Sequence, residues 1–214
     1  MFALLLSLFF AVCRWQSPGA ALSGAEVDGF MRALRQGNAM PEPMRGEFLK
    51  RLDAWGRADD GKPFYMLNLM RMHEHLQPWP GVQLAAGTPA EANAFYEKAV
   101  LKMALAQGLQ LTVGANAVQR GQGSNALMDA GAAENWSRVL LVRYPSRRAF
   151  LELISKPEYL EIMPYKFASL DVTLVPTDGE SITPDVRVLA GAAALAIMLA
   201  FGWLRAIRRA RSPA

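Results

Sequence analysis

Polar side chains suited to binding or orienting a small molecule gather on one short stretch of the chain. Residues 64–72 read FYMLNLMRM, and Asn68 shares one alternation of this stretch with Met66 and Met70. A buried amide without partners costs about 1–3 kcal/mol, so Asn68 requires a hydrogen bond. That bond either fixes the structure or orients a ligand. Arg71 and His73 share the opposite alternation near the end of the stretch, where side chains can reach the mouth of a cavity.

A second group of candidates ends the stretch 136–144, WSRVLLVRY. Arg143 can pair with a carboxylate through two parallel hydrogen bonds, and Tyr144 follows it. Ser146 stands at the start of the next helix, a position that favours anions. A helix cap and an interface ion pair are the simpler account of Arg143 and Ser146.

Three aromatic residues complete the candidate set. Tyr96 and Tyr159 each lie on the apolar face of a predicted helix, so each is either a core residue with a hydrogen-bonded hydroxyl or a catalytic acid. Trp136 is expected to pack at the edge of the domain or of a dimer. Together these observations predict a ligand pocket built from Asn68, Arg71, His73, Tyr96, Trp136, Arg143, Tyr144 and Ser146.

Neither a metal nor a cofactor is predicted. His73 and His75 are the only histidines, and no cysteine cluster or Glu-rich motif completes a metal site around them. The single cysteine, Cys13, excludes an intramolecular disulfide framework. No phosphate loop, dinucleotide fingerprint, nucleophile elbow or paired-carboxylate motif is present.

The elements that would position these residues follow from apolar periodicity and from three capping boxes, which begin at Ser23, Thr88 and Ser155. Helices are predicted over 24–36, 44–55, 88–107, 146–154 and 155–163, and strands over 64–72, 109–117, 136–144 and 171–175. From the first strand onward the order is β-α-β-β-α-β with a split second helix. This order predicts a ferredoxin-like α+β fold, in which helices cover one face of an antiparallel sheet. The first two helices either pack on this domain or form a stalk.

Two predicted strands, 64–72 and 136–144, are apolar on both alternations. A sheet with helices on one face must then bury its other face against something else. An identical subunit is the simplest partner, so the sequence predicts a homodimer.

The chain begins with an apolar run of 11 residues, Phe2 to Val12. A helix of this length is too short to cross a hydrocarbon core of about 30 Å. Its length is that of the central part of an export signal, cleaved or retained, although Arg14 follows the run and no basic residue precedes it. A lipoprotein signal at Cys13, a misassigned start and a buried helix are the alternatives.

The C-terminal end carries a longer apolar run, Val188 to Leu204, with 17 residues and no charge. It predicts a membrane-spanning helix, and Trp203 stands at its end as interfacial aromatics do. Four arginines follow, so the positive-inside rule places the tail in the cytoplasm. The domain between the two runs is therefore expected outside the cytoplasm, anchored in the cytoplasmic membrane.

Several motifs resemble one bacterial family. YMLNLMRM at 65–72, Tyr96, ENWSRVLLVRYPSRRAFLEL at 134–153 and PEYLEI at 157–162 are similar to the domain-of-unknown-function family numbered thirteen-thirty. The resemblance covers about residues 60–176. It implies the dimeric α+β barrel superfamily, a homodimer with sheets packed face to face, and a pocket between sheet and helices.

The family often has Trp-Asp where this chain has Trp136-Ser137, and it commonly carries His or Arg where this chain has Pro164-Tyr165-Lys166. An acid or base role is therefore not carried over to these positions. The domain organisation expected from residues and resemblance together is a signal-like segment (1–22), a helical extension (23–59), a dimeric α+β barrel domain (60–178), a linker (179–187), a transmembrane helix (188–204) and a basic cytoplasmic tail (205–214).

The distribution of charge along the chain does not support nucleic acid as a partner. The chain has 23 Lys and Arg against 19 Asp and Glu, but residues 24–184 hold 17 basic and 18 acidic residues, so the excess lies in the flanks. Three functions stay open: a membrane-anchored homodimer that binds a small, partly apolar ligand, a cofactor-independent enzyme resembling an oxygenase or isomerase, and a scaffold whose N-terminal helices recruit a membrane partner.

Overall fold

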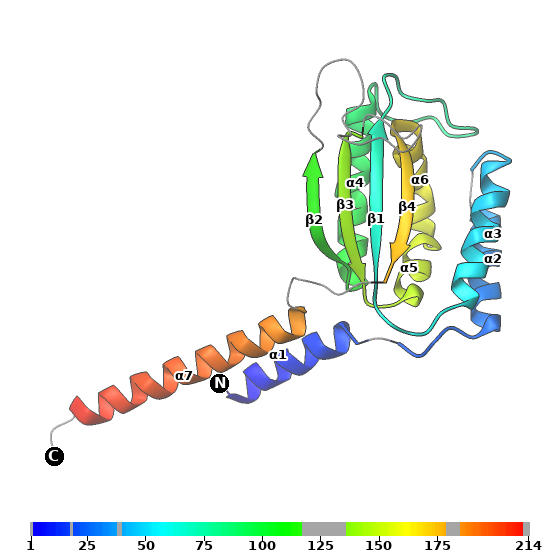
Figure 1. Ribbon diagram of the computed structural model, residues 1–214. Helices are drawn as coiled ribbons and strands as arrows, with labels where there is room; N and C mark the ends of the chain where they lie inside the picture. The colour runs from blue at the N-terminus through cyan, green and yellow to red at the C-terminus, as the bar shows by residue number, and fades with distance from the viewer. Residues whose placement is uncertain (1, 18, 38–39, 117–135, 179–184, 212–214) are drawn as a thin grey trace, which may run out of the picture. The chain divides into compact units, whose positions relative to one another are not determined.

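The structure, a computed structural model, describes residues 2–17, 19–37, 40–116, 136–178 and 185–211 (Figure 1). Its elements in chain order are α1 (Phe2–Trp15), α2 (Gly24–Gly37), α3 (Met44–Arg57), β1 (Phe64–Met72), α4 (Pro89–Ala106), β2 (Gln110–Asn116), β3 (Arg138–Tyr144), α5 (Arg147–Ile154), α6 (Pro157–Ser169), β4 (Leu170–Thr177) and α7 (Val186–Arg211). Residues Pro18–Gly179 form one compact unit, and Met1–Ser17 with Glu180–Ala214 form another.

The larger unit is an α+β structure built on a four-stranded antiparallel sheet with the order β2-β3-β1-β4. The predicted strand over 64–72 is confirmed with the same bounds, and it is one of the two central strands. The predicted strand over 109–117 is found as Gln110–Asn116, with a register shift between Leu111 and Val113; Ala117 lies outside the described residues.

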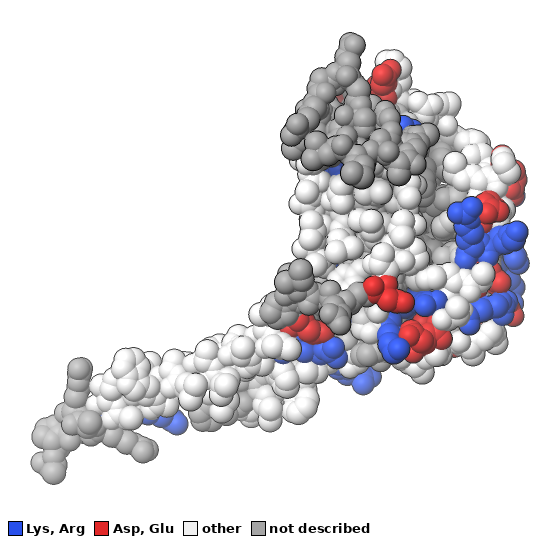
Figure 2. All heavy atoms as spheres, viewed as in Figure 1, with Lys and Arg blue, Asp and Glu red and all other residues white. Residues whose placement is uncertain are grey.

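The two faces of the sheet differ in what covers them. Even-numbered residues of β1, from Phe64 to Met70, are buried on the side of the helices. On the opposite side Leu67 and Leu69 are half-buried, and Val113 and Val175 are 47% and 39% exposed. We call this side the open face, because no described helix of the unit covers it (Figure 1). In Figure 2 the visible atoms of this face are almost all uncharged.

Local signals in the sequence set two helix starts. At α2, Ser23 Oγ accepts from the Glu26 N–H and Glu26 Oε2 accepts from the Ser23 N–H, which is the predicted capping box. At α4, Thr88 Oγ1 accepts from the Glu91 N–H, and Pro89 takes the first helical position.

The third predicted capping box, at Ser155, is wrong. The Ser155 hydroxyl donates to the Leu151 carbonyl at 2.6 Å, because Ser155 ends α5 and satisfies a carbonyl of its last turn. Lys156 is the residue that precedes α6, and it makes no side-chain cap bond. A serine can serve either end of adjacent helices, and the sequence pattern alone did not distinguish the two.

The helical extension packs on the domain and is not a free stalk. Asp59 Oδ2 accepts from the Leu22 N–H at 2.9 Å, and Arg147 of α5 donates to the Trp55 carbonyl at 2.6 Å. Fully buried Leu151 faces Gly56, where an added Cβ would lie 3.5 Å from its Cδ1 and 3.3 Å from Val27 Cγ1. Helices α2, α3 and α5 therefore share one apolar contact.

The second unit contains one helix long and apolar enough to cross a membrane, Val186–Arg208, and none of that stretch is buried. This confirms a helix at the predicted span.

Truncation of Leu151 tests the docking of the extension. We expect Leu151→Ala to lower the free energy of unfolding by about 2–5 kcal/mol, because it opens a cavity where three helices meet. Denaturant titration of the full chain in detergent, followed by circular dichroism, measures the change. Leu101→Ala, at a 54% exposed position of α4, is the control and should have little effect. Equal effects of the two substitutions would contradict this packing.

Candidate functional site

A polar cluster lies buried in the layer between the sheet and helices α4 and α6. Tyr96 of α4 and Tyr159 of α6 meet there, with their hydroxyl oxygens 3.4 Å apart and their rings at 78° to one another. Both side chains are buried within the main apolar core. The cluster joins the two helices that pack against each other on this side of the sheet (Figure 1).

Lys166 brings a positive charge into this cluster. It lies on α6 two turns after Tyr159 and is only 7% exposed. Its Nζ lies 5.4 Å from the centre of the Tyr96 ring and 6.0 Å from that of Phe167. Among the described residues, none forms a hydrogen bond or ion pair with this ammonium group. Burial lowers the pKa of Lys166 to about 8, and the nearby Glu97 carboxylate opposes that shift.

The Glu97 carboxylate pairs with residues other than Lys166. Its Oε1 accepts a hydrogen bond from Asn93 at 3.1 Å and forms an ion pair with Arg138 of β3. The Asn93 Oδ1 is buried and has no hydrogen-bond partner among the described residues. The layer therefore holds one cation and one acceptor whose interactions inside the protein are incomplete.

The tyrosine hydroxyls of the layer stay protonated over the physiological pH range. Burial raises the pKa of Tyr96 well above its ordinary value, and Tyr159 and Tyr144 add to the effect. Burial likewise raises the pKa values of Tyr144 and Tyr159. These groups can donate or accept hydrogen bonds but are poorly suited to act as bases.

Three of the predicted site residues face this layer. Asn68 is buried on the helix side of β1, where its Nδ2 donates to the Met66 carbonyl at 3.0 Å. Tyr96 belongs to the cluster itself. Tyr144 pairs with Phe64 across the sheet, and their rings stack 5.0 Å apart.

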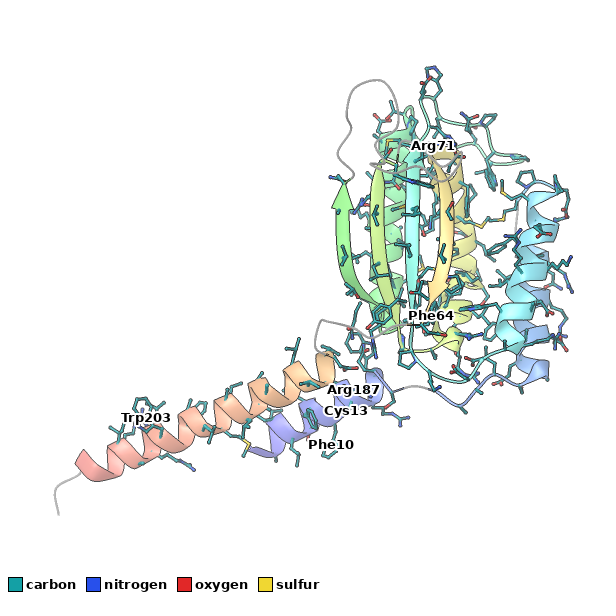
Figure 3. The ribbon with its side chains drawn as sticks, viewed as in Figure 1. Phe10, Cys13, Phe64, Arg71, Arg187 and Trp203 are labelled. Atoms are coloured by element: carbon teal, nitrogen blue, oxygen red, sulfur yellow. The ribbon has the colours of Figure 1, made fainter. Side chains whose placement is uncertain are left out.

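Arg71 and His73 lie elsewhere, at the end of β1 opposite to Phe64 (Figure 3). Arg71 Nε donates to Asp171 Oδ2 at 3.0 Å, and both side chains are about half exposed. His73 Nε2 lies 3.8 Å from Asp171 Oδ1. This group is an ion-pair network between β1 and β4, separate from the buried layer.

The other predicted residues occupy three further positions. Arg143 is buried on the alternation of the open face, opposite Tyr65 and Gln110 in the register of the sheet. Ser146 caps α5 by accepting from the Ala149 N–H at 3.2 Å, as the simpler account of this serine predicts. Trp136 precedes β3 and is half-buried. The structure thus does not bring all eight predicted residues together.

Sequence reasoning missed the charged members of the layer, which are Lys166, Glu97 and Arg138, and the polar Asn93. A signal existed for the lysine, because Tyr159, Ile162, Met163 and Lys166 recur at spacings of three, one and three on one helical face. Pro164 does not end α6, which continues to Ser169 and keeps Lys166 on that face.

The residue types of the layer suit an anionic group better than they suit acid–base chemistry. An unpaired buried ammonium group attracts a carboxylate or phosphate, and the incompletely bonded amide oxygen of Asn93 suits a donor. Among the described residues, no group of three or more His, Cys, Asp or Glu side chains is placed to hold a metal ion.

Comparison with known proteins extends only to the fold. No protein-family model matches the chain, and no curated protein does. A solved structure of RPA0582, a protein of unknown function from Rhodopseudomonas palustris, is 25% identical, covers 69% of this chain and 99% of its own, and has a TM-score of 0.49. The methylated RPA0582 protein is 24% identical over 69% of this chain and 98% of its own, with a TM-score of 0.51. The second likeness shows the fold alone.

The pH dependence of stability tests the state of Lys166. A lysine whose folded pKa is about 8, against 10.5 as its ordinary value, destabilises the fold below pH 8 and does so less as pH rises toward 10.5. Relative to Lys166→Met, we expect wild type to gain about 2 kcal/mol of unfolding free energy between pH 7 and pH 9.5. The buried tyrosines are common to both proteins, so the difference isolates the lysine. A constant difference would contradict a buried, unpaired Lys166.

Proposed function

We propose that this chain is a membrane-anchored homodimeric module of the ferredoxin-like, dimeric α+β barrel kind that binds a small, partly apolar ligand with an anionic group. The observation that carries the ligand is Lys166, whose residue is only 7% exposed and whose ammonium group has no hydrogen-bond or ion-pair partner among the described residues. The proposal places the anionic group of the ligand at Lys166 and its apolar part against the core side chains.

The composition of the layer supports an amphipathic ligand. Met66 and Met163 belong to the same buried core as Tyr96 and Tyr159. Methionine side chains adapt to irregular apolar shapes, which suits a site that must accept a guest molecule. Desolvation of an unpaired ammonium group costs several kcal/mol, and a bound anion offsets much of that cost.

The open face supports the homodimer. It is apolar along its centre, where Leu67, Leu69, Val139 and Leu141 are half-buried within a single chain. Exposed apolar patches of this kind mark interaction sites. A second copy offers a face of the same shape and character, as an isologous interface requires.

The second unit supports membrane anchoring. Large apolar side chains of α7 such as Leu199 and Trp203 are 65% and 68% exposed, and arginines follow at positions 205 and 208. In lipid these side chains would be solvated by hydrocarbon. We place the tail in the cytoplasm and the α+β domain on the outer side of the bacterial inner membrane, following the distribution of arginines.

One observation favours a second function, a cofactor-independent enzyme. Burial lowers the pKa of Lys166 to about 8, which brings a neutral amine within reach of physiological pH. A base with such a pKa suits proton transfer. In this alternative Lys166 removes a proton from the bound molecule, and Tyr96 contributes its ring and hydroxyl to the site.

A charge on the open face tests the dimer. We expect Leu69→Glu to convert the full chain in detergent from dimer to monomer, because a carboxylate at the centre of the interface would be buried without a partner. Analytical ultracentrifugation measures the mass. Leu101→Glu, on the exposed surface of α4, should remain dimeric. A monomeric wild type would contradict the proposal directly.

Ligand capture tests the role of Lys166. We expect small molecules extracted from the purified full chain and identified by mass spectrometry to include an anionic amphiphile, depleted at least several-fold in Lys166→Met. Lys102→Met, at an exposed position of α4, removes an equal charge and should retain the ligand. Equal recovery from both variants would exclude binding at Lys166, whereas conversion of the captured molecule by wild type alone would favour the enzyme.

A further inference from the structure

Helices α1 and α7 lie side by side within the smaller unit (Figure 1). The side chains of α1 divide by exposure into two faces. One face is half-buried and the other is open, with Leu4, Leu6, Leu8 and Phe10 between 55% and 63% exposed. The half-buried positions recur at helical spacing and are Leu5, Phe9, Val12 and Cys13. They form a stripe that we call the contact face of α1.

The matching face of α7 consists of small residues. Ala190, Gly191 and Ala194 are half-buried, whereas residues 195–206 are exposed. A Cβ added to Gly191 would lie 3.2 Å from Phe9 Cε2, so the absent side chain of glycine makes room for the phenylalanine ring. In membranes, where water does not drive helices together, small residues at an interface allow the close packing that holds them.

The two helices run antiparallel. Phe9 faces Gly191, and four residues later Cys13 lies near Arg187, four residues earlier in α7 (Figure 3). Figure 3 draws Cys13 and Arg187 at one end of the pair and Trp203 toward the other end of α7. Arg14 and Trp15, which end α1, therefore lie at the end where α7 begins, and arginine and tryptophan are typical of a membrane interface.

We propose that α1 is retained in the mature protein as a companion membrane helix, which enters the lipid from the interface where α7 begins and covers the Ala190-Gly191-Ala194 face. This inference rests on the proposed membrane anchoring. At about 1.5 Å per residue, the 14 residues of α1 are about 21 Å long, which is shorter than a hydrocarbon core of about 30 Å.

This arrangement accounts for Arg14, the charge that fits a cleaved export signal poorly. A signal has its basic residues before the apolar run, whereas Arg14 follows it. At the end of a retained helix the guanidinium reaches the headgroup region while the preceding residues stay in hydrocarbon. Removal of α1 would instead leave the small-residue face of α7 without the Phe9 ring that fills it.

Cross-linking of the full chain in native membranes tests the inference. In a Cys13→Ser background, Phe9→Cys with Gly191→Cys should react with a short bifunctional maleimide within one chain. Trypsin then yields a linked pair of peptides, residues 1–14 and 188–205, identified by mass. Leu8→Cys with Gly191→Cys is the matched control, because Leu8 is 55% exposed on the other face of α1, and it should give a several-fold lower yield.

The outcomes distinguish the companion helix from the membrane anchoring. A mature chain that lacks residues 1–14, equal yields from the two cysteine pairs, or links only between different chains would each overturn the companion helix. A chain released from membranes by alkaline carbonate would overturn the membrane anchoring itself, and with it the inference.

A second measurement uses the native cysteine. Cys13 is half-buried and is the only cysteine of the chain. We expect Gly191→Leu to raise the rate of Cys13 labelling by a maleimide several-fold, because the larger side chain displaces the Phe9 ring. Gly202→Leu should leave the rate unchanged, since nothing lies within 4 Å of a Cβ added there. An unchanged rate in Gly191→Leu would contradict the packing.

Discussion

Both faces of the sheet carry mainly apolar side chains along its centre, and the described helices of its unit cover only one of the two faces. Strand β1 is hydrogen-bonded on both sides, to β3 and β4, so it cannot turn its apolar side chains away from either face. Burial of apolar area contributes roughly 25 cal/mol per Å², and an uncovered sheet centre forgoes that contribution. This constraint orders the rest of the molecule. The polar layer lies on the helix side of the sheet. The uncovered apolar side chains of the open face are the reason for proposing a second copy there.

The helix side of the sheet is packed with residue types that are unusual in a protein core. A layer filled only by leucine and phenylalanine would be more stable than one that buries Lys166 beside Tyr96. The cation–π contact with the Tyr96 ring recovers part of the cost of desolvation, on the order of 2 kcal/mol in a desolvated setting. The part of the desolvation cost that this contact does not recover is the physical basis of the proposed ligand. Glu97 pairs with Arg138 and Asn93, so an anion from outside the protein would pair with Lys166.

Local patterns predicted most of the elements, because their causes are local. The strand over 64–72 and the helix starts at Ser23 and Thr88 depend on alternation and on hydrogen bonds within four residues. The capping box at Ser155 failed because two helices compete for one hydroxyl, which the sequence does not rank. The site was predicted less well. Asn68 and Tyr96 are recognisable from the strand and the helix that contain them. The role of Lys166 depends on its contact with the Tyr96 ring, which lies 70 residues earlier in the chain.

The hydrophobic ends of the chain show the same difference between local and long-range information. Each run taken alone is ambiguous, because 11 residues suit an export signal and 17 residues are short for a span. The packing of the two helices relates one run to the other, because the Phe9 ring of α1 fills the space that a side chain at Gly191 would occupy. Other residues of α7, such as Leu195 and Leu199, are large and exposed. The position of the small residues on α7 therefore carries information about α1 that neither apolar run contains by itself.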